Sequence, residues 1–292
     1  MDQAIEMKKY SLLIGNGINN VDGDNSWDRL IQRIGEFCKI DFKIDADRKK
    51  HFPLLYEEIF LCTAKKTGLT ESKLKTFIGQ QVAAIKENDL HQKIRSLETT
   101  DLLTTNYEFA IEGLTPMFND GVVKETRYSI FRHYVIGSKK VWHLHGDSMH
   151  PNSINLGFEH YGGQLQQVRN YVASGTNYST NGVSKLPLVN RLLKGNVSND
   201  SWIDLFFTTD IHIIGLTLDY VETDLWWLLT YRARKVIEKR HRIKNRIVYY
   251  IPTKFAKAVE NKLALLRATA VEVVVIDKTG REFYSEILGK FH

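Results

Sequence analysis

The stretch YSLLIGNGIN, residues 10–19, is a short apolar run followed at once by a glycine turn. The length of the run and its stop at Gly15 are typical of a strand buried in a parallel sheet. Ser26 is suited to cap a helix, and apolar side chains recur at helical spacing from Trp27 to Phe37. The order of strand, glycine turn and helix predicts the opening βα unit of a nucleotide-binding fold.

Five more apolar runs of strand length follow, at residues 101–105, 140–144, 211–214, 247–251 and 271–276. Segments with helical spacing separate them, above all within residues 54–88. Asp219, with Glu222 three residues later, resembles a capping box that starts another helix. This alternation predicts an α/β fold with a Rossmann-like, mostly parallel sheet that carries helices on both faces.

The length of 292 residues and a hydrophobic content of 43% allow one large domain over residues 1–292. The segment 107–140 shows scattered aromatic residues without clear periodicity, and we expect a small helical insert there. Residues 174–184 are rich in Ser, Thr, Asn and Gly, so we expect them to form a mobile loop.

The chain has two cysteines, Cys38 and Cys62, and no CxxC motif, which excludes a four-cysteine zinc site. No apolar run approaches the roughly 18 residues of a membrane span, so we expect no membrane insertion and a cytoplasmic location. The net charge is +6, and its densest part lies at residues 232–246. That stretch is interpreted as a solvated helix face or as a docking surface for RNA or a protein. It lacks interleaved aromatic residues, which makes nucleic-acid binding the weaker interpretation.

Two glycine motifs follow predicted strands and are candidate dinucleotide-binding loops. Gly15 and Gly17 would let the backbone approach a pyrophosphate, with Asn19 beside it. Gly215 and Thr217 follow the strand at residues 211–214 and would bound the adenosine half. A turn that needs positive φ explains the Gly15 motif nearly as well, and a plain strand-to-helix turn capped by Asp219 explains the Gly215 motif equally well. Asn20 replaces the third glycine of the dehydrogenase fingerprint.

Two further motifs offer side chains for catalysis. Thr105, a candidate cofactor-binding residue, is the last residue of the strand at residues 101–105, and Asn106 follows it. The Asn106 amide is able to hold a water or a ribose hydroxyl without adding charge. An asparagine turn that satisfies its own backbone is the alternative. His143 and His145 share one face of a strand, but no further ligand cluster supports a metal site. His145, next to a glycine at the strand end, is the better placed of the two to act as a base.

Taken in order, residues 15–19, 105–108, 144–146 and 215–218 resemble the motifs of the sirtuin-like family. The segments read GNGIN, TNYE, LHG and GLTL, where the family has GAG-I-S, Q-N-I-D, L-H-G and G-T-S-L. Asp219 and Asp224 after the last motif look more like the bacterial branch that acts in anti-phage defence. Deacylating sirtuins hold a structural zinc with four cysteines, and this chain has no such set.

The resemblance implies an enzyme that takes NAD as substrate, needs no zinc and cleaves the nicotinamide–ribose bond with Asn106 and His145. It also implies an effector of defence that is activated by a ligand, by homo-oligomerisation or by a second subunit encoded in the same operon. The alternatives are a non-catalytic NAD or ADP-ribose sensor, and a deacylase or ADP-ribosyltransferase of the sirtuin type.

Overall fold

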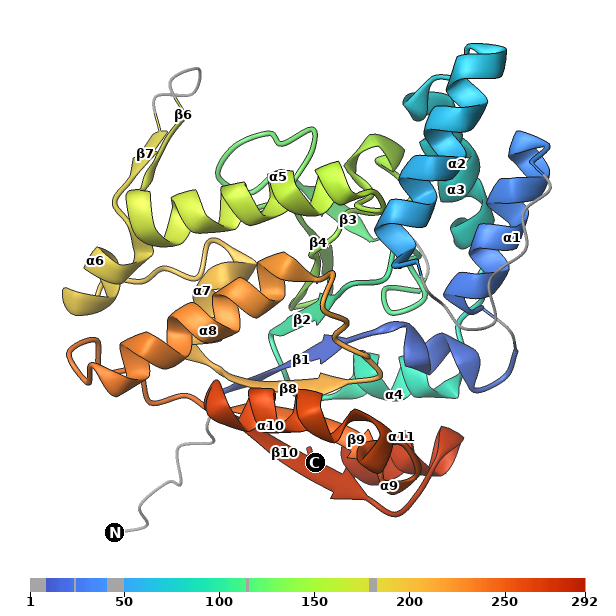
Figure 1. Ribbon diagram of the computed structural model, residues 1–292. Helices are drawn as coiled ribbons and strands as arrows, with labels where there is room; N and C mark the ends of the chain where they lie inside the picture. The colour runs from blue at the N-terminus through green and yellow to red at the C-terminus, as the bar shows by residue number, and fades with distance from the viewer. Residues whose placement is uncertain (1–8, 24, 41–49, 114–115, 179–182, 292) are drawn as a thin grey trace, which may run out of the picture.

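The computed structural model of the chain describes residues 9–23, 25–40, 50–113, 116–178 and 183–291. Eight strands of these residues form the main sheet, and the list gives their bounds: β1 (Tyr10–Ile14), β2 (Asp101–Thr104), β3 (Met117–Asn119), β4 (His133–Ile136), β5 (Lys139–His143), β8 (Asp210–Ile214), β9 (Ile247–Pro252) and β10 (Val271–Ile276). Their order across the sheet is β10-β9-β8-β1-β2-β5-β4-β3 (Figure 1). All the predicted strands are confirmed, with ends that differ by one residue at most.

The strands from β10 to β5 are parallel, while β4 and β3 are antiparallel at the edge. Counted along the chain, the six parallel strands have the spatial order 3-2-1-4-5-6 of doubly wound dinucleotide-binding folds. After β1, the chain adds β2 and β5 on one side of this strand, and later adds β8, β9 and β10 on the other side. The strand order therefore switches between β1 and β8. In such folds, ligands bind at this switch point, outside the carboxyl ends of the strands. The Rossmann-like α/β fold predicted from the sequence is therefore confirmed.

The helices of the described residues are α1 (Trp27–Cys38), α2 (Phe52–Thr67), α3 (Glu71–Ala83), α4 (Asp89–Ser96), α5 (Phe158–Arg169), α6 (Leu188–Leu193), α7 (Trp202–Thr208), α8 (Thr223–Ile237), α9 (Thr253–Ala256), α10 (Glu260–Ala268) and α11 (Gly280–Leu288). Successive residues of β1 enter different cores: Leu13 packs with α5, α7 and α8, whereas Leu12 packs with α4 and α11. The sheet is thus covered on both faces, which explains why its central strands are apolar throughout. None of the described helices is long and apolar enough to cross a membrane.

A separate helical lobe lies between β1 and β2 in the sequence and consists of α1, α2 and α3 (Figure 1). It has its own core, in which Ile34, Tyr56 and Ile78 are completely or almost completely buried. Ser26 caps α1 as predicted, because its hydroxyl accepts a hydrogen bond from the Arg29 amide. This lobe covers the carboxyl edge of the sheet with helices that do not belong to the doubly wound core.

The prediction of a small helical insert at residues 107–140 is wrong for the residues of this segment that the structure describes, 107–113 and 116–140. That segment contributes β3 and β4, and β4 pairs with β5 to extend the main sheet. The expected loop at residues 174–184 contains an antiparallel hairpin of β6 (Thr176–Tyr178) and β7 (Val183–Lys185), and residues 179–182 lie outside the described residues. Strands β3 and β4 are short, and β6 and β7 form a separate two-stranded sheet of three residues each, so neither pair carries a clear apolar period in the sequence.

The start of α8 also differs from the prediction. The helix begins at Thr223, and Glu222 is its N-cap residue, but no cap hydrogen bond of the Glu222 side chain is found within the described structure. Asp219 accepts a hydrogen bond from the Tyr220 amide instead of starting the helix. Leu218, with a φ of 49°, turns the chain through the left-handed region, which delays the helix. Capping of α8 therefore does not account for the position of the Glu222 carboxylate.

Candidate active site

The two glycine loops meet at the switch point between β1 and β8. The Gly15 amide donates to the Ile214 carbonyl at 2.9 Å, and the Gly17 amide donates to the Gly215 carbonyl at 2.8 Å. A methyl group on Gly15 would lie 2.5 Å from the Gly215 carbonyl oxygen, and one on Gly17 would lie 2.4 Å from the hydroxyl of Tyr284. Gly215 itself has a φ of 65°. The glycines therefore allow two loops of the protein to touch, in addition to any approach of a ligand.

Replacing Gly15 by alanine is expected to destabilise the protein by about 1–3 kcal/mol, the usual cost of overpacking a tight site. The atoms in the way are backbone atoms of Gly215 and Leu216, so no side-chain rotation relieves the clash. Gly23→Ala is the matched control, because a methyl group there meets nothing within 4 Å. Thermal unfolding without NAD should separate the two variants, and equal melting temperatures would contradict this role of Gly15.

The other predicted binding residues lie around these loops. The Asn19 amide nitrogen donates to Glu108 and to Asn16, both at 2.9 Å, and its oxygen is 3.0 Å from Nε2 of His91. Asn19 thus connects the glycine loop to residues on two other segments. Thr217 is exposed at the rim. Thr105 is buried, and its amide donates to the carbonyl of Ile14 at the end of β1.

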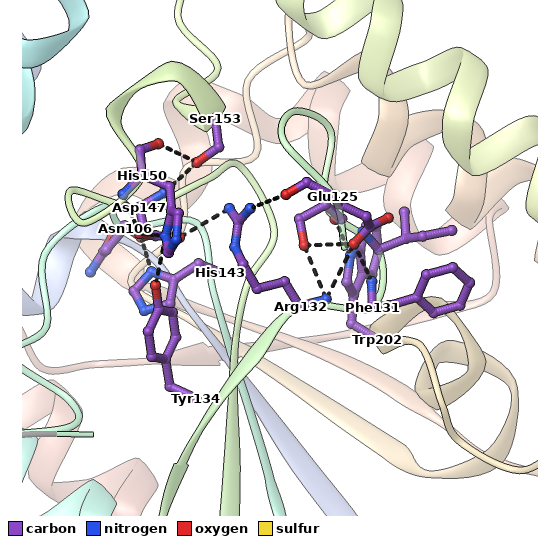
Figure 2. A network of polar contacts seen from close by, with 12 residues as sticks. Asn106, Glu125, Phe131, Arg132, Tyr134, His143, Asp147, His150, Ser153 and Trp202 are labelled. Atoms are coloured by element: carbon purple, nitrogen blue, oxygen red, sulfur yellow. Dashed lines mark hydrogen bonds and ion pairs between the residues drawn. The ribbon is translucent and has the colours of Figure 1, made fainter. Parts of the chain in front are cut away.

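Asn106 follows β2 and presents an unpartnered amide group. Its side chain is 4% exposed, and neither Nδ2 nor Oδ1 makes a hydrogen bond to any described residue. The backbone of Asn106 is firmly held, since its amide donates to Thr104 and its carbonyl oxygen lies 2.7 Å from Nδ1 of His143 (Figure 2). A buried polar group without partners costs free energy, so this amide is suited to receive a ligand or a water.

His145 follows β5 and pairs with a carboxylate from the opposite side of the site. Its Nε2 lies 3.1 Å from Oδ2 of Asp224 in the first turn of α8, and both side chains are buried. Burial lowers the pKa of His145, but the charge and hydrogen bond of Asp224 outweigh it, and the pKa is raised above its ordinary value. Since Asp224 occupies one ring nitrogen, the other remains for proton transfer, which is the arrangement of a base and its orienting acid.

The register of β2 and β5 places Asn106 and His145 in the segments that follow two adjacent strands. Thr104 is opposite His143 in this parallel pair, and the Leu144 amide donates to the Thr104 carbonyl at 2.8 Å. Asn106 and His145 each come two residues after that pair, beyond the ends of the strands. Both segments therefore leave the sheet at its carboxyl edge, from strands that lie about 4.8 Å apart.

His143 shares the motif with His145 but not its environment. Its Nδ1 contacts the Asn106 carbonyl and its Nε2 lies 2.7 Å from Glu112, so both ring nitrogens are occupied. Burial lowers the pKa of His143, but Glu112 outweighs this effect and raises it to about 9. His143 is therefore a charged structural residue that holds the Asn106 backbone in place.

A small pocket opens against Asn106. It holds about 50 Å³ and is lined by residues of the glycine loop, of α1, of α3 and of the segment after β2, among them Asn16, Trp27, Arg29 and Glu108. Burial raises the pKa of the Glu108 carboxyl group in its wall. Ligand pockets in proteins usually measure about 300–1,000 Å³, so this one admits a few waters in the conformation described.

Two acidic residues of the site were not among the predicted catalytic residues. Asp224 was noted only as part of the family resemblance, and Glu222 only as part of a capping box. Acidic residues are common in the first turn of any helix because they interact favourably with its dipole. Because of that general preference, an acidic residue in a first turn gives no specific signal in the sequence, and the contact of Asp224 with His145 is visible only in the structure.

No model of a known protein family matches this chain, and no curated protein matches it either. The sirtuin-like resemblance therefore rests on the four short motifs alone.

Proposed function

We propose that the protein is an NAD hydrolase that cleaves the nicotinamide–ribose bond to give nicotinamide and ADP-ribose. The observation that carries this proposal is that the unpartnered, buried amide of Asn106 and the His145 of the His145–Asp224 pair follow adjacent strands at the carboxyl edge of the sheet. The four motifs that resemble the sirtuin-like family lie at the same edge of the sheet. Under this proposal the protein is an effector of anti-phage defence whose activity depends on a partner or a ligand.

The chemistry needs few groups, because nicotinamide leaves a cationic N-glycoside as a neutral molecule. No acid has to protonate the leaving group, so a pair of glycosidase carboxylates is unnecessary. The protein must hold the ribose in a reactive geometry and activate an attacking oxygen. We assign the first task to the Asn106 amide and the second to His145, which accepts the proton while Asp224 orients its ring.

The remaining contacts follow from the position of the loops at the switch point. We assign the pyrophosphate to the loop of Gly15, Gly17 and Asn19, with Thr105 beside it. The adenosine half would lie along Gly215 and the exposed Thr217. Because the pocket at Asn106 holds only about 50 Å³, side chains around it have to move before a ribose can enter.

The small volume favours a second candidate function, a regulatory subunit that binds NAD or ADP-ribose at the outer loops without cleaving it. Incubation of the purified protein with NAD separates the two functions. We expect slow release of free nicotinamide by the isolated chain, and faster release with the proteins encoded beside its gene. Chromatography measures the nicotinamide released by the isolated chain and by the chain with these proteins. If NAD binds but neither sample releases nicotinamide, the regulatory subunit is favoured. ADP-ribosylated or deacylated protein as the main product would favour a transferase or deacylase.

A further inference from the structure

Glu222 is a buried carboxylate to which the mechanism above assigns no task. The residue is 8% exposed, and its Oε2 atom makes no hydrogen bond to any part of the chain that the structure describes. It is the N-cap residue of α8, yet no cap hydrogen bond of its side chain is found in that part of the chain. The helix dipole and a hydrogen bond from the backbone of Asp219 offset only part of the cost of burying this carboxylate. The position of Glu222 therefore indicates an electrostatic partner.

The groups that face Glu222 come from four other parts of the site and from its own loop: Tyr107 after β2, His145 after β5, Tyr161 of α5, Tyr249 of β9, and Asp219 and Asp224. Of these groups, His145 is the one that can carry a positive charge. Asp224 uses Oδ2 for His145, while its Oδ1 makes no hydrogen bond to a described residue. Asp224 contacts the imidazole directly, and the buried carboxylate of Glu222 lies two residues before Asp224 in the chain.

We propose that Glu222 is a positioning residue, a second carboxylate that stabilises protonated His145 and thereby sets the pH range in which His145 can accept a proton. Its role in turnover rests on the proposed function, whereas its effect on His145 does not. Burial raises the pKa of Glu222 to about 7, although the positive charge of His145 lowers the pKa of Glu222. The charges of Asp224 and Glu222 in turn raise the pKa of His145 against the effect of its burial.

The consequence for activity has a definite sign. Only neutral imidazole accepts a proton, so the rate falls about tenfold for each pH unit below the pKa of His145. Loss of the Glu222 charge removes stabilisation of the imidazolium and lowers that pKa. The acid limb of the pH–rate profile then moves to lower pH, and a larger share of the maximal rate survives in acid.

The test compares Glu222→Gln with Asp219→Asn, which removes the same charge from an exposed side chain three residues earlier. The His145 ring is titrated by NMR in protein with ¹⁵N-labelled histidine and without NAD, and its signal is identified by its absence in His145→Ala. We expect the midpoint to fall by about half a unit to one unit in Glu222→Gln, a three- to tenfold change in proton affinity. Asp219→Asn should shift it far less, because water and salt screen an exposed charge.

The same variants are then assayed for nicotinamide release from NAD between pH 5 and 9. A midpoint that stays at the parental value in folded Glu222→Gln overturns the proposal, as does a uniform loss of rate with an unmoved acid limb. If no variant releases nicotinamide, the proposed function fails, and the titration of His145 still decides the role of Glu222. If Glu222→Gln does not fold, Glu222→Met removes the charge in a side chain of similar size and should give the same downward shift.

Discussion

Replacing His145 by alanine is expected to lower NAD hydrolysis by about 10²–10⁴-fold, the usual contribution of a general base. The ring is held by Asp224, and the segment after the adjacent strand carries the unpartnered amide of Asn106. Its neighbour His143 has both ring nitrogens occupied by Glu112 and the Asn106 carbonyl. The measurement is the rate of nicotinamide release under saturating NAD, with the partner present if the isolated chain is slow.

Two companion variants make this result interpretable. His145→Ala leaves Asp224 buried without its partner and should destabilise the protein, so its unfolding must be followed in parallel. Asn106→Ala removes an amide that makes no hydrogen bond to a described residue, so we expect it to keep the fold while losing activity. His51→Ala, at an exposed position before α2, is the control that should retain the parental rate. Parental activity in both His145→Ala and Asn106→Ala would show that the assignment of the site is wrong.

Asp147→Asn is expected to destabilise the protein by about 3–5 kcal/mol, because it leaves a buried arginine without a counter-charge. Oδ2 of Asp147 lies 3.0 Å from the guanidinium of Arg132, and both side chains are almost inaccessible to water. Oδ1 of Asp147 lies 3.0 Å from Nδ1 of His150 and accepts the backbone amide of that residue (Figure 2). The free energy of unfolding in urea measures the loss.

An exposed pair provides the control. Glu260→Gln breaks the contact of Glu260 with Arg267, where both side chains are about half exposed, and should cost less than about 1 kcal/mol. The two variants lose the same kind of charge, so the difference between them reports burial. Equal losses, or no loss in Asp147→Asn, would contradict a structural role for the buried pair.

The same pair predicts the effect of acid on the folded state. Burial raises the pKa of Asp147, but His150, Arg132 and His143 outweigh it and hold that pKa well below its ordinary value of 3.8. A carboxyl group with a lowered pKa in the folded protein stabilises it fully above its ordinary pKa and loses that effect as the pH falls. The difference in stability between the parent and Asp147→Asn should therefore shrink as the pH falls below about 4.

The parallel strands and the places where they end could be predicted from the sequence alone. Residues 10–14 form an apolar run that is too short for a helix and stops at a glycine, so a buried strand is the structure that it predicts. The predicted Ser26 cap of α1 was equally local, since it depends on one hydroxyl and the amides that follow it. Such predictions succeed because neighbouring residues supply both the pattern and its physical cause.

The errors have a common cause as well. Strands β3 and β4 are short and end the sheet beside β5. The pairing of β4 with β5, and of β3 with β4, depends on the partner strand and not on their own pattern. The late start of α8 depends on the left-handed turn at Leu218. Leucine rarely adopts this conformation, so the sequence does not predict the turn. Both features are decided by contacts between segments, which outweigh local preference.

By itself, the sequence determined the positions of six apolar strands and the polar motifs that follow four of them, because the apolar and glycine patterns that mark them are local. Only the tertiary structure decided which motifs touch. The register of β2 and β5 places Asn106 and His145 after adjacent strand ends, and the packing of α8 brings Asp224 into contact with the imidazole of His145. A pairing register and a helix position are set by the summed packing of the whole core, and no stretch of a dozen residues contains that information.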